Sequence, residues 1–226
     1  MPTATDDLDT LRAQLDEAPL AGLTGRFHSH LTVAEVPDAA AFDRLCRRHH
    51  AKRTVIDLDR FDDRVQRDVM TTRYHQDDAP GALGRLVDDL RAMCADLEAA
   101  GLRVLRVKVE HESLPSLPTY GATRYHEVHV KLDLPEDGYD DVMAWLREQA
   151  PATGWVPSRN PNERREGRVL QFVTFRCYEG DRALADERVA EVRARLEARG
   201  LRIAEIKRET TVLDTRVDHD AWWLSA

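Results

Sequence analysis

Cysteine is scarce in this sequence of 226 residues: there are three cysteines, and no two of them have the CxxC spacing of thiolate metal sites. Cys46 and Cys94 fall within apolar helical patterns, which predicts that both are buried as small hydrophobic side chains. The chain also lacks a glycine-rich phosphate-binding loop, the G-x-G-x-x-G pattern and the G-x-S-x-G turn of serine hydrolases. These absences argue against enzymes that bind nucleotides through a glycine-rich loop and against serine hydrolases with a nucleophile turn.

Long hydrophobic runs are missing as well. No apolar segment approaches the roughly 18 residues that would span a bilayer. The acidic N-terminus does not have the basic and then apolar layout of a secretion signal. We therefore expect a cytoplasmic protein that is not associated with a membrane.

Positive charge is in the minority. The sequence has 33 Lys and Arg residues against 41 Asp and Glu residues, so its formal net charge is −8. General nucleic-acid binding needs a basic surface that neutralises phosphates, and this composition argues against it. A small anionic substrate in a local group of basic side chains remains compatible with the charge.

What the chain does contain is a pattern that occurs twice. The similar segments are residues 101–110 and 200–209, His30-Leu-Thr-Val and His129-Val-Lys-Leu, and residues 69–75 and 172–178. The first two pairs are 99 positions apart, and the third pair is 103 positions apart. Two copies are too few for a solenoid, so the pattern predicts two fused, similar halves with a site between them.

The order of the expected elements is the same in both copies. A strand, a helix, two strands, a helix and a last strand follow one another, which is the order of a ferredoxin-like unit. The helices are expected at about 38–50 and 79–100, and again at about 138–149 and 184–199. We therefore predict an α+β protein made by tandem duplication of a ferredoxin-like βαββαβ unit, with two antiparallel sheets facing across a polar cleft.

Five segments make up the expected organisation. They are an N-terminal helical extension at 1–25, a first ferredoxin-like repeat at 26–112, a linker at 113–124, a second repeat at 125–212 and a C-terminal tail at 213–226. The tail contains Trp222 and Trp223 and is expected to pack against the body of the protein or against a partner subunit. If the tail packs against a partner subunit, the protein is expected to be a homodimer.

Alternation along each strand predicts which side chains share a face. The apolar side chains are expected under the helices, and the polar ones on the opposite face. The expected polar sets are His28, His30, Thr32, Arg106, Lys108 and Glu110 in the first copy and Glu127, His129, Lys131, Glu205, Lys207 and Glu209 in the second. The third strands are expected to add Thr71, Arg73 and His75 in the first copy, and Thr174, Arg176 and Tyr178 in the second. Strands favour β-branched and aromatic residues, so this accumulation indicates a solvated face or a polar cleft.

One functional interpretation is acid–base chemistry by the symmetric pair His30 and His129, because imidazole titrates near neutral pH. Arg73, Arg176 and Lys131 are expected to hold a phosphate or carboxylate group and to stabilise developing negative charge. Thr32 and Tyr178 complete the expected substrate-binding set. This interpretation requires no metal ion or cofactor.

The run from Phe27 to Val33 contains His30-Leu31-Thr32, which resembles the H-x-T half-motif of the 2H phosphoesterases. Those enzymes are two-lobed, need no metal and use one such motif in each lobe. The resemblance implies that His30 and His129 are the acid–base pair and that Thr32 binds phosphate. The second copy departs from the motif, because Lys131 stands where the family places Thr or Ser.

A second interpretation is a metal centre. His28 and His30 share a strand face and lie about 6.5–7 Å apart along the backbone. The second copy offers Glu127 and His129 in the same register, and His75 is a substitute for one of the four. Imidazole and carboxylate ligands in this combination suit Zn, Mn or Fe(II).

Two interpretations involve no catalysis at these positions. Lys108 with Glu110, and Lys207 with Glu209, are also typical of ion pairs on a solvated sheet. Ferredoxin-like units also occur as regulatory domains, because a fold does not imply a function, so a ligand-binding or assembly module is the other alternative. The number of titratable side chains on one face favours an enzyme.

Overall fold

The computed structural model describes residues 8–9, 20–59, 65–112, 125–159, 164–178 and 182–220 of the chain. The chain divides into two units: the first holds Met1–Thr54, Val69–Leu117 and Thr210–Val217, and the second holds Val55–Asp68, Pro118–Glu209 and Asp218–Ala226. The predicted linker at 113–124, most of the predicted N-terminal helix and the tryptophans Trp222 and Trp223 lie outside the described residues.

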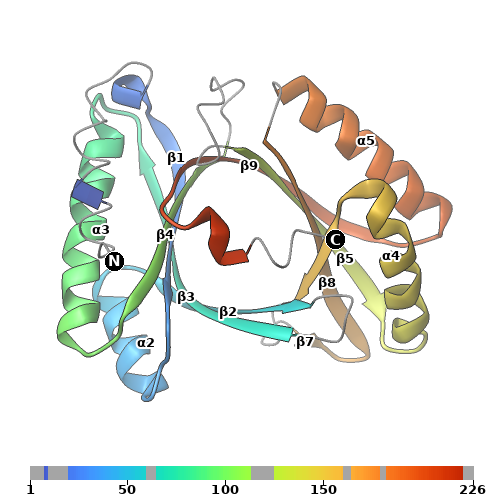
Figure 1. Ribbon diagram of the computed structural model, residues 1–226, viewed down its shortest axis with the longest axis horizontal. Coiled ribbons are helices and arrows are strands. Elements are labelled where there is room, and N and C mark those ends of the chain that lie inside the picture. The colour runs from blue at the N-terminus through green and yellow to red at the C-terminus, as the bar shows by residue number, and fades with distance from the viewer. Residues whose placement is uncertain are drawn as a thin grey trace. The chain divides into compact units, whose positions relative to one another are not determined.

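A strand, a helix, two strands, a helix and a strand follow one another in the first part of the chain, which is the predicted order (Figure 1). They are β1 (Gly25–Val33), α2 (Ala39–Arg48), β2 (Lys52–Asp59), β3 (Val65–Asp77), α3 (Ala82–Ala99) and β4 (Val104–His111), preceded by the 3₁₀ turn η1 (Leu20–Gly22). The Asp38 carboxylate accepts a hydrogen bond from the backbone N–H of Ala41 at 2.9 Å, so it caps the N-terminus of α2. Gly101 follows α3 with a φ of +79°, the left-handed conformation in which glycine ends helices.

The second part of the chain has a similar order of elements. They are β5 (Tyr125–Pro135), α4 (Tyr139–Thr153), β6 (Val156–Arg159), β7 (Arg164–Arg165), β8 (Arg168–Cys177), α5 (Arg182–Ala198) and β9 (Ile203–Asp214), followed by the 3₁₀ turn η2 (Val217–Asp220). Strands β2, β3 and β9 each contribute residues to both units.

The predicted α+β duplication with two separate ferredoxin-like sheets facing across a polar cleft is wrong. The described strands are hydrogen-bonded in the order β5-β9-β4-β1-β3-β2-β6-β8-β7, and β5 also pairs with β8. Eight of the described strands therefore form one closed antiparallel ring, and β7 is attached to β8 alone.

Two pairs of strand edges account for this difference. Strand β2 pairs with β6 at Asp57↔Arg159 within the second unit, and β4 pairs with β9 at Val109↔Leu213 within the first. An unpaired edge leaves backbone N–H and C=O groups without partners. Joining the edges satisfies these groups, whereas two separate sheets would leave them exposed.

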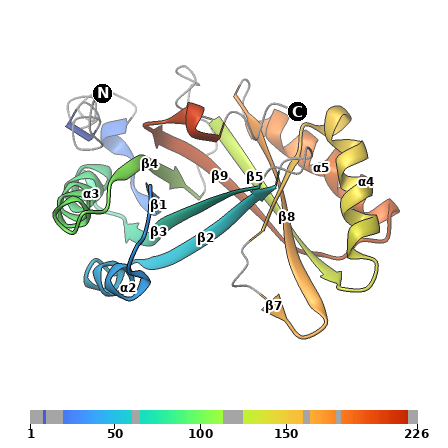
Figure 2. The same cartoon turned by 60° about the horizontal axis from the view of Figure 1, so that its bottom comes forward.

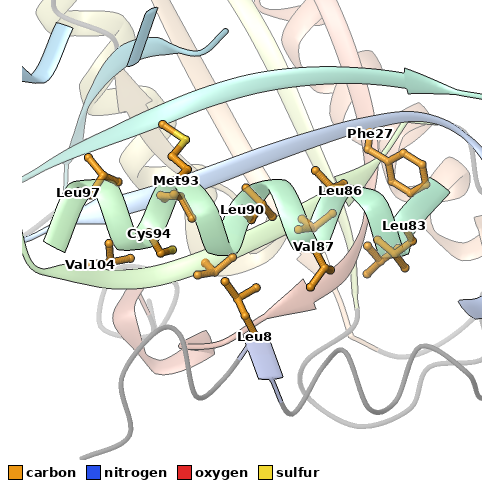
Figure 3. Packing of buried hydrophobic residues seen from close by; sticks show 14 of the residues in the cluster. Leu8, Phe27, Leu83, Leu86, Val87, Leu90, Met93, Cys94, Leu97 and Val104 are labelled. Carbon is orange, nitrogen blue, oxygen red and sulfur yellow. The ribbon is translucent and has the colours of Figure 1, made fainter. Parts of the chain in front are cut away.

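A core of aliphatic and aromatic side chains fills the first unit. Helices α2 and α3 lie on the same side of β1, β3 and β4 (Figure 1, Figure 2). Leu83, Leu86, Leu90 and Leu97 of α3 are buried, and Figure 3 shows them along the helix with Phe27 at one end. Their spacings of three, four and seven residues place them on one helix face.

The predicted burial of Cys46 and Cys94 is confirmed, since their exposed fractions are 1% and 0%. Burial raises the pKa of the Cys46 thiol to about 11 and that of Cys94 to about 12. These thiols are therefore protonated at neutral pH, as expected for inert structural cysteines.

The second unit has its own core, which α4 and α5 cover on one side of β5 and β8 (Figure 1). Trp155 is the largest of the fully buried side chains, and its indole Nε1 donates a hydrogen bond to the carbonyl of Leu146 at 2.9 Å. This bond satisfies the polar atom that burying a tryptophan would otherwise leave unpaired.

The predicted division of β1 and β5 into two faces is confirmed by these cores. Phe27, Leu31 and Val33 belong to the core under α2 and α3, and Val128 and Val130 belong to the core under α4 and α5. The intervening polar side chains lie on the opposite face of each strand. In the described part of the chain, no helix is both long and apolar enough to span a membrane.

Candidate functional site

Three side chains of the first unit converge on the face opposite its helices. In the antiparallel pair of β1 and β4, His28 lies opposite Glu110 and His30 lies opposite Lys108. One ligand atom each from His28, His30 and Glu110 lies within 4.8 Å of the other two. The side chains of His28 and Glu110 are 2% exposed and that of His30 is 18% exposed, so His30 forms the open side of the cluster.

The two ring nitrogens of His30 have different partners. Its Nδ1 lies 3.1 Å from the Thr72 hydroxyl, which lies 2.7 Å from the Thr54 hydroxyl. Its Nε2 lies 3.2 Å from Oε2 of Glu110, while Oε1 of Glu110 lies 2.5 Å from Nζ of Lys108. When Nδ1–H donates to Thr72, Nε2 keeps its lone pair and directs it at a carboxylate oxygen.

The arrangement of His30 Nε2 and Glu110 Oε2 suits a cation bound between these two atoms. Ligand atoms that share a metal at about 2.0–2.2 Å lie roughly 3.3–3.6 Å apart in tetrahedral geometry, and the Nε2–Oε2 distance of 3.2 Å is close to this separation. The Thr72 hydroxyl gives the far nitrogen of His30 a hydrogen-bond partner, as the second nitrogen of a metal-binding histidine usually has. His28, His30 and Glu110 are therefore able to hold a divalent metal ion.

The second unit contains a similar cluster around His129. Its Nδ1 lies 2.8 Å from the Thr174 hydroxyl. Its Nε2 lies 3.3 Å from Oε2 of Glu127 and 3.5 Å from Oε2 of Glu209. Nζ of Lys207 lies 2.8 Å from the other oxygen of Glu209, as Lys108 does beside Glu110.

Glu127 occupies the position in β5 that His28 occupies in β1, and the guanidinium of Arg176 neutralises its charge. Arg176 Nε donates to Glu127 at 2.5 Å, and the two terminal nitrogens of Arg176 donate to Asp220 at 2.8 and 2.7 Å. Burial would lower the pKa of Arg176, but the surrounding negative charges, that of Glu127 first, raise it well above its usual value. Among the described residues, no comparable group of three metal-ligand atoms lies wholly in the second unit.

The predicted role of Arg176 in binding a substrate anion does not fit this geometry. Its side chain is 2% exposed, and its guanidinium is held by Glu127 and Asp220. Lys131 and Tyr178 lie in the same unit: Lys131 Nζ is 5.3 Å from the centre of the Phe172 ring, and the Tyr178 hydroxyl is 3.5 Å from Arg176. Thr32 lies on the face of His30 but is only 3% exposed.

The predicted placement of Thr71, Arg73 and His75 is wrong. Arg73 lies opposite Ser29 and His75 lies opposite Phe27, so both point to the helix side of the sheet. Arg73 donates to Asp89 of α3 at 2.7 Å instead of joining His30. A shift of one residue moves every side chain of a strand to the other face.

Thr72 and Tyr74 of the third strand lie on the face that was predicted for Arg73. Thr72 is opposite His30 as Thr174 is opposite His129, and Tyr74 is opposite His28 as Arg176 is opposite Glu127. The third strands therefore correspond at a distance of 102 positions, not 103. The repeated Thr in Thr72 and Thr174 is the sequence signal that identifies this register.

His75 is buried on the helix side, where its Nε2 has no hydrogen-bond partner among the described residues. Burial, and then the positive charge of Arg73, lower the pKa of His75 from its usual 6.5 to about 4. The unfolded chain therefore takes up a proton at about pH 6.5 that the folded chain accepts only near pH 4. This difference makes the protein less stable as the pH falls through that interval.

We expect His75→Gln to weaken the dependence of the free energy of unfolding on pH. Urea denaturation at a series of pH values would give the free energy of unfolding of both proteins, and their difference should shift in favour of the variant between about pH 6.5 and 4. Parallel curves for the two proteins would contradict the buried neutral state of His75.

No protein-family model matches the chain, and the curated proteins include none with significant similarity to it.

Proposed function

We propose that the protein is an enzyme that depends on a divalent metal ion, held by His28, His30 and Glu110, and that it acts on a small anionic substrate. The observation that carries this proposal is the 3.2 Å approach of His30 Nε2 to Glu110 Oε2 in a cluster whose third member is His28. Two imidazoles and one carboxylate are a ligand set of catalytic Zn and Fe(II) sites.

Three protein ligands leave coordination positions open for water and substrate. A bound divalent ion would attract an anionic oxygen of the substrate and polarise it. Lys108 has a positioning role in this proposal: its ammonium group binds one oxygen of Glu110, which leaves the other oxygen directed at His30. Zn, Mn and Fe(II) are the ions that this set suits.

Metal analysis tests the proposal. We expect protein purified without chelators or a histidine tag to contain close to one Zn, Mn or Fe per chain by plasma mass spectrometry. Glu110→Gln should lower the affinity for that ion by more than the roughly 10–100-fold that loss of an outer partner costs. Thr72→Val, which removes an outer partner of His30, should cost about 10–100-fold.

The second unit offers matched controls for both variants. Glu209 contacts His129 and Lys207 much as Glu110 contacts His30 and Lys108, and Thr174 corresponds to Thr72. Glu209→Gln and Thr174→Val should leave the metal content unchanged. Absence of stoichiometric metal, or full retention in Glu110→Gln, would refute the metal centre.

A metal-free phosphoesterase is the second candidate, in line with the resemblance of His30-Leu31-Thr32 to the H-x-T half-motif. It is supported by the equivalence of His30 and His129, each of which has a threonine at Nδ1 and a glutamate at Nε2. It receives less support than the metal centre, because both ring nitrogens are already engaged within the protein. A protein free of stoichiometric metal that hydrolyses phosphoesters in the presence of a chelator would favour it.

A further inference from the structure

An exposed aromatic ring adjoins the proposed metal ligands. Tyr74 is 48% exposed, although its strand, β3, lies between β1 and β2 in the sheet. Its ring centre lies 3.7 Å from that of His28, to which it is opposed in the register of β1 and β3. A large aromatic group open to solvent beside a ligand cluster is able to contact a bound substrate.

Two cationic side chains flank this ring. The guanidinium carbon of Arg26 lies 5.8 Å from the ring centre, and Nζ of Lys52 lies 5.9 Å from it. The side chain of Arg26 is 56% exposed and also contacts Glu112 at 3.2 Å, and Lys52 is exposed as well. Strands β1, β3 and β2 are neighbours in the sheet and bring the three side chains together.

The corresponding position of the second unit is built differently. There Arg176 takes the register position of Tyr74, and Glu127 takes that of His28. Arg176 is buried in its ion pairs with Glu127 and Asp220, so this position offers neither an exposed ring nor an available cation. The exposed ring with two flanking cations thus belongs to the unit that contains His28, His30 and Glu110.

We propose that Tyr74, Arg26 and Lys52 form a substrate subsite for a planar aromatic anion. The aromatic ring of the ligand stacks against Tyr74, and its phosphate or carboxylate group lies between Arg26 and Lys52. Aromatic rings attract one another in offset or edge-to-face geometry, and guanidinium and ammonium groups bind phosphate and carboxylate. As the subsite of an enzyme it rests on the proposed function, but binding itself does not need the metal.

Three matched probes test the subsite on the full-length protein. Phenyl phosphate has the ring and the anion, cyclohexyl phosphate has the anion without an aromatic ring, and phenol has the ring without the anion. In calorimetric titrations we expect phenyl phosphate to bind at least about tenfold more tightly than either of the others. Tyr74→Leu and Lys52→Gln should each weaken its binding by roughly 3- to 30-fold, while Tyr74→Phe keeps the ring and most of the affinity.

Arg193 supplies the control, because it is a cation of the second unit whose side chain is 56% exposed, as is that of Arg26. Arg193→Gln should not change the affinity for phenyl phosphate. Undetectable binding, equal binding of the three probes, or unchanged binding in Tyr74→Leu would each overturn the subsite. Repeating the titration after chelator treatment separates the two proposals. If the protein never holds stoichiometric metal and still prefers phenyl phosphate to the other two probes, the subsite is supported and the metal centre is refuted.

Discussion

Replacing Arg176 with Met is expected to lower the free energy of unfolding by about 3–5 kcal/mol, as removal of one partner of a buried ion pair typically does. The arginine side chain is 2% exposed and donates to both Glu127 and Asp220. The variant removes the guanidinium charge from beside both carboxylates, whose side chains are 2% and 6% exposed. Urea denaturation followed by circular dichroism would measure the loss.

The loss should depend on pH in a defined direction. Without Arg176, burial raises the folded-state pKa of Glu127 and Asp220 above the ordinary carboxyl value of about 4. As the pH rises past that value the unfolded chain releases its protons first, which favours unfolding. The deficit of the variant should therefore be largest near neutral pH and smaller near pH 4.

Arg195→Met is the matched control. Arg195 forms an exposed pair with Glu191 on α5, and a pair of this kind contributes about 0.3–0.5 kcal/mol. Equal losses in Arg176→Met and Arg195→Met would show that burial of the Arg176 network does not stabilise the fold. A further variant, Arg176→Met with Glu127→Gln, should recover part of the loss, because it removes the charge of one of the two buried carboxylates that Arg176 contacts.

Leu90→Ala is expected to lower the free energy of unfolding by about 2–5 kcal/mol, because it opens a cavity in a close-packed core. Leu90 is 1% exposed at the middle of α3, between Leu86 and Leu97 in Figure 3. The same denaturation experiment would measure this effect. Since α3 covers the face opposite His28 and His30, the remaining folded protein should keep its metal content.

The control for this variant is Leu90→Met, which conserves volume and is expected to cost less than about 1.5 kcal/mol. A loss in Leu90→Ala no greater than that in Leu90→Met would mean that the core adjusts to the cavity. The packing of α3 on β1 and β4 would then be looser than its buried side chains indicate.

Local features of the chain could be predicted because they depend on residues close in sequence. Asp38 indicates the start of α2 and Gly101 the end of α3, and both act in the structure as their chemistry predicts. Alternation in β1 also correctly separated Phe27 and Leu31, in the core, from His28 and His30, on the other face.

Errors arose where a prediction depended on the relation between distant strands. The similarity of residues 69–75 to 172–178 aligned Arg73 with Arg176, one position away from the register that pairs His30 with Thr72 and His129 with Thr174. One residue is enough to exchange the two faces of a strand. Thr72 and Tyr74 were therefore missed, and Arg73 was assigned to the wrong face.

Side-chain alternation and helix capping are properties of a short stretch of backbone. The four long helices, most of the strands and the face of β1 that carries His28 and His30 could therefore be predicted from the residues alone. The contact of Glu110 with His30, that of Glu127 with Arg176 and the closed order of the strands became known only from the three-dimensional structure. Strand edges pair through backbone N–H and C=O groups that every residue except proline has, so the side-chain pattern does not specify which edges meet.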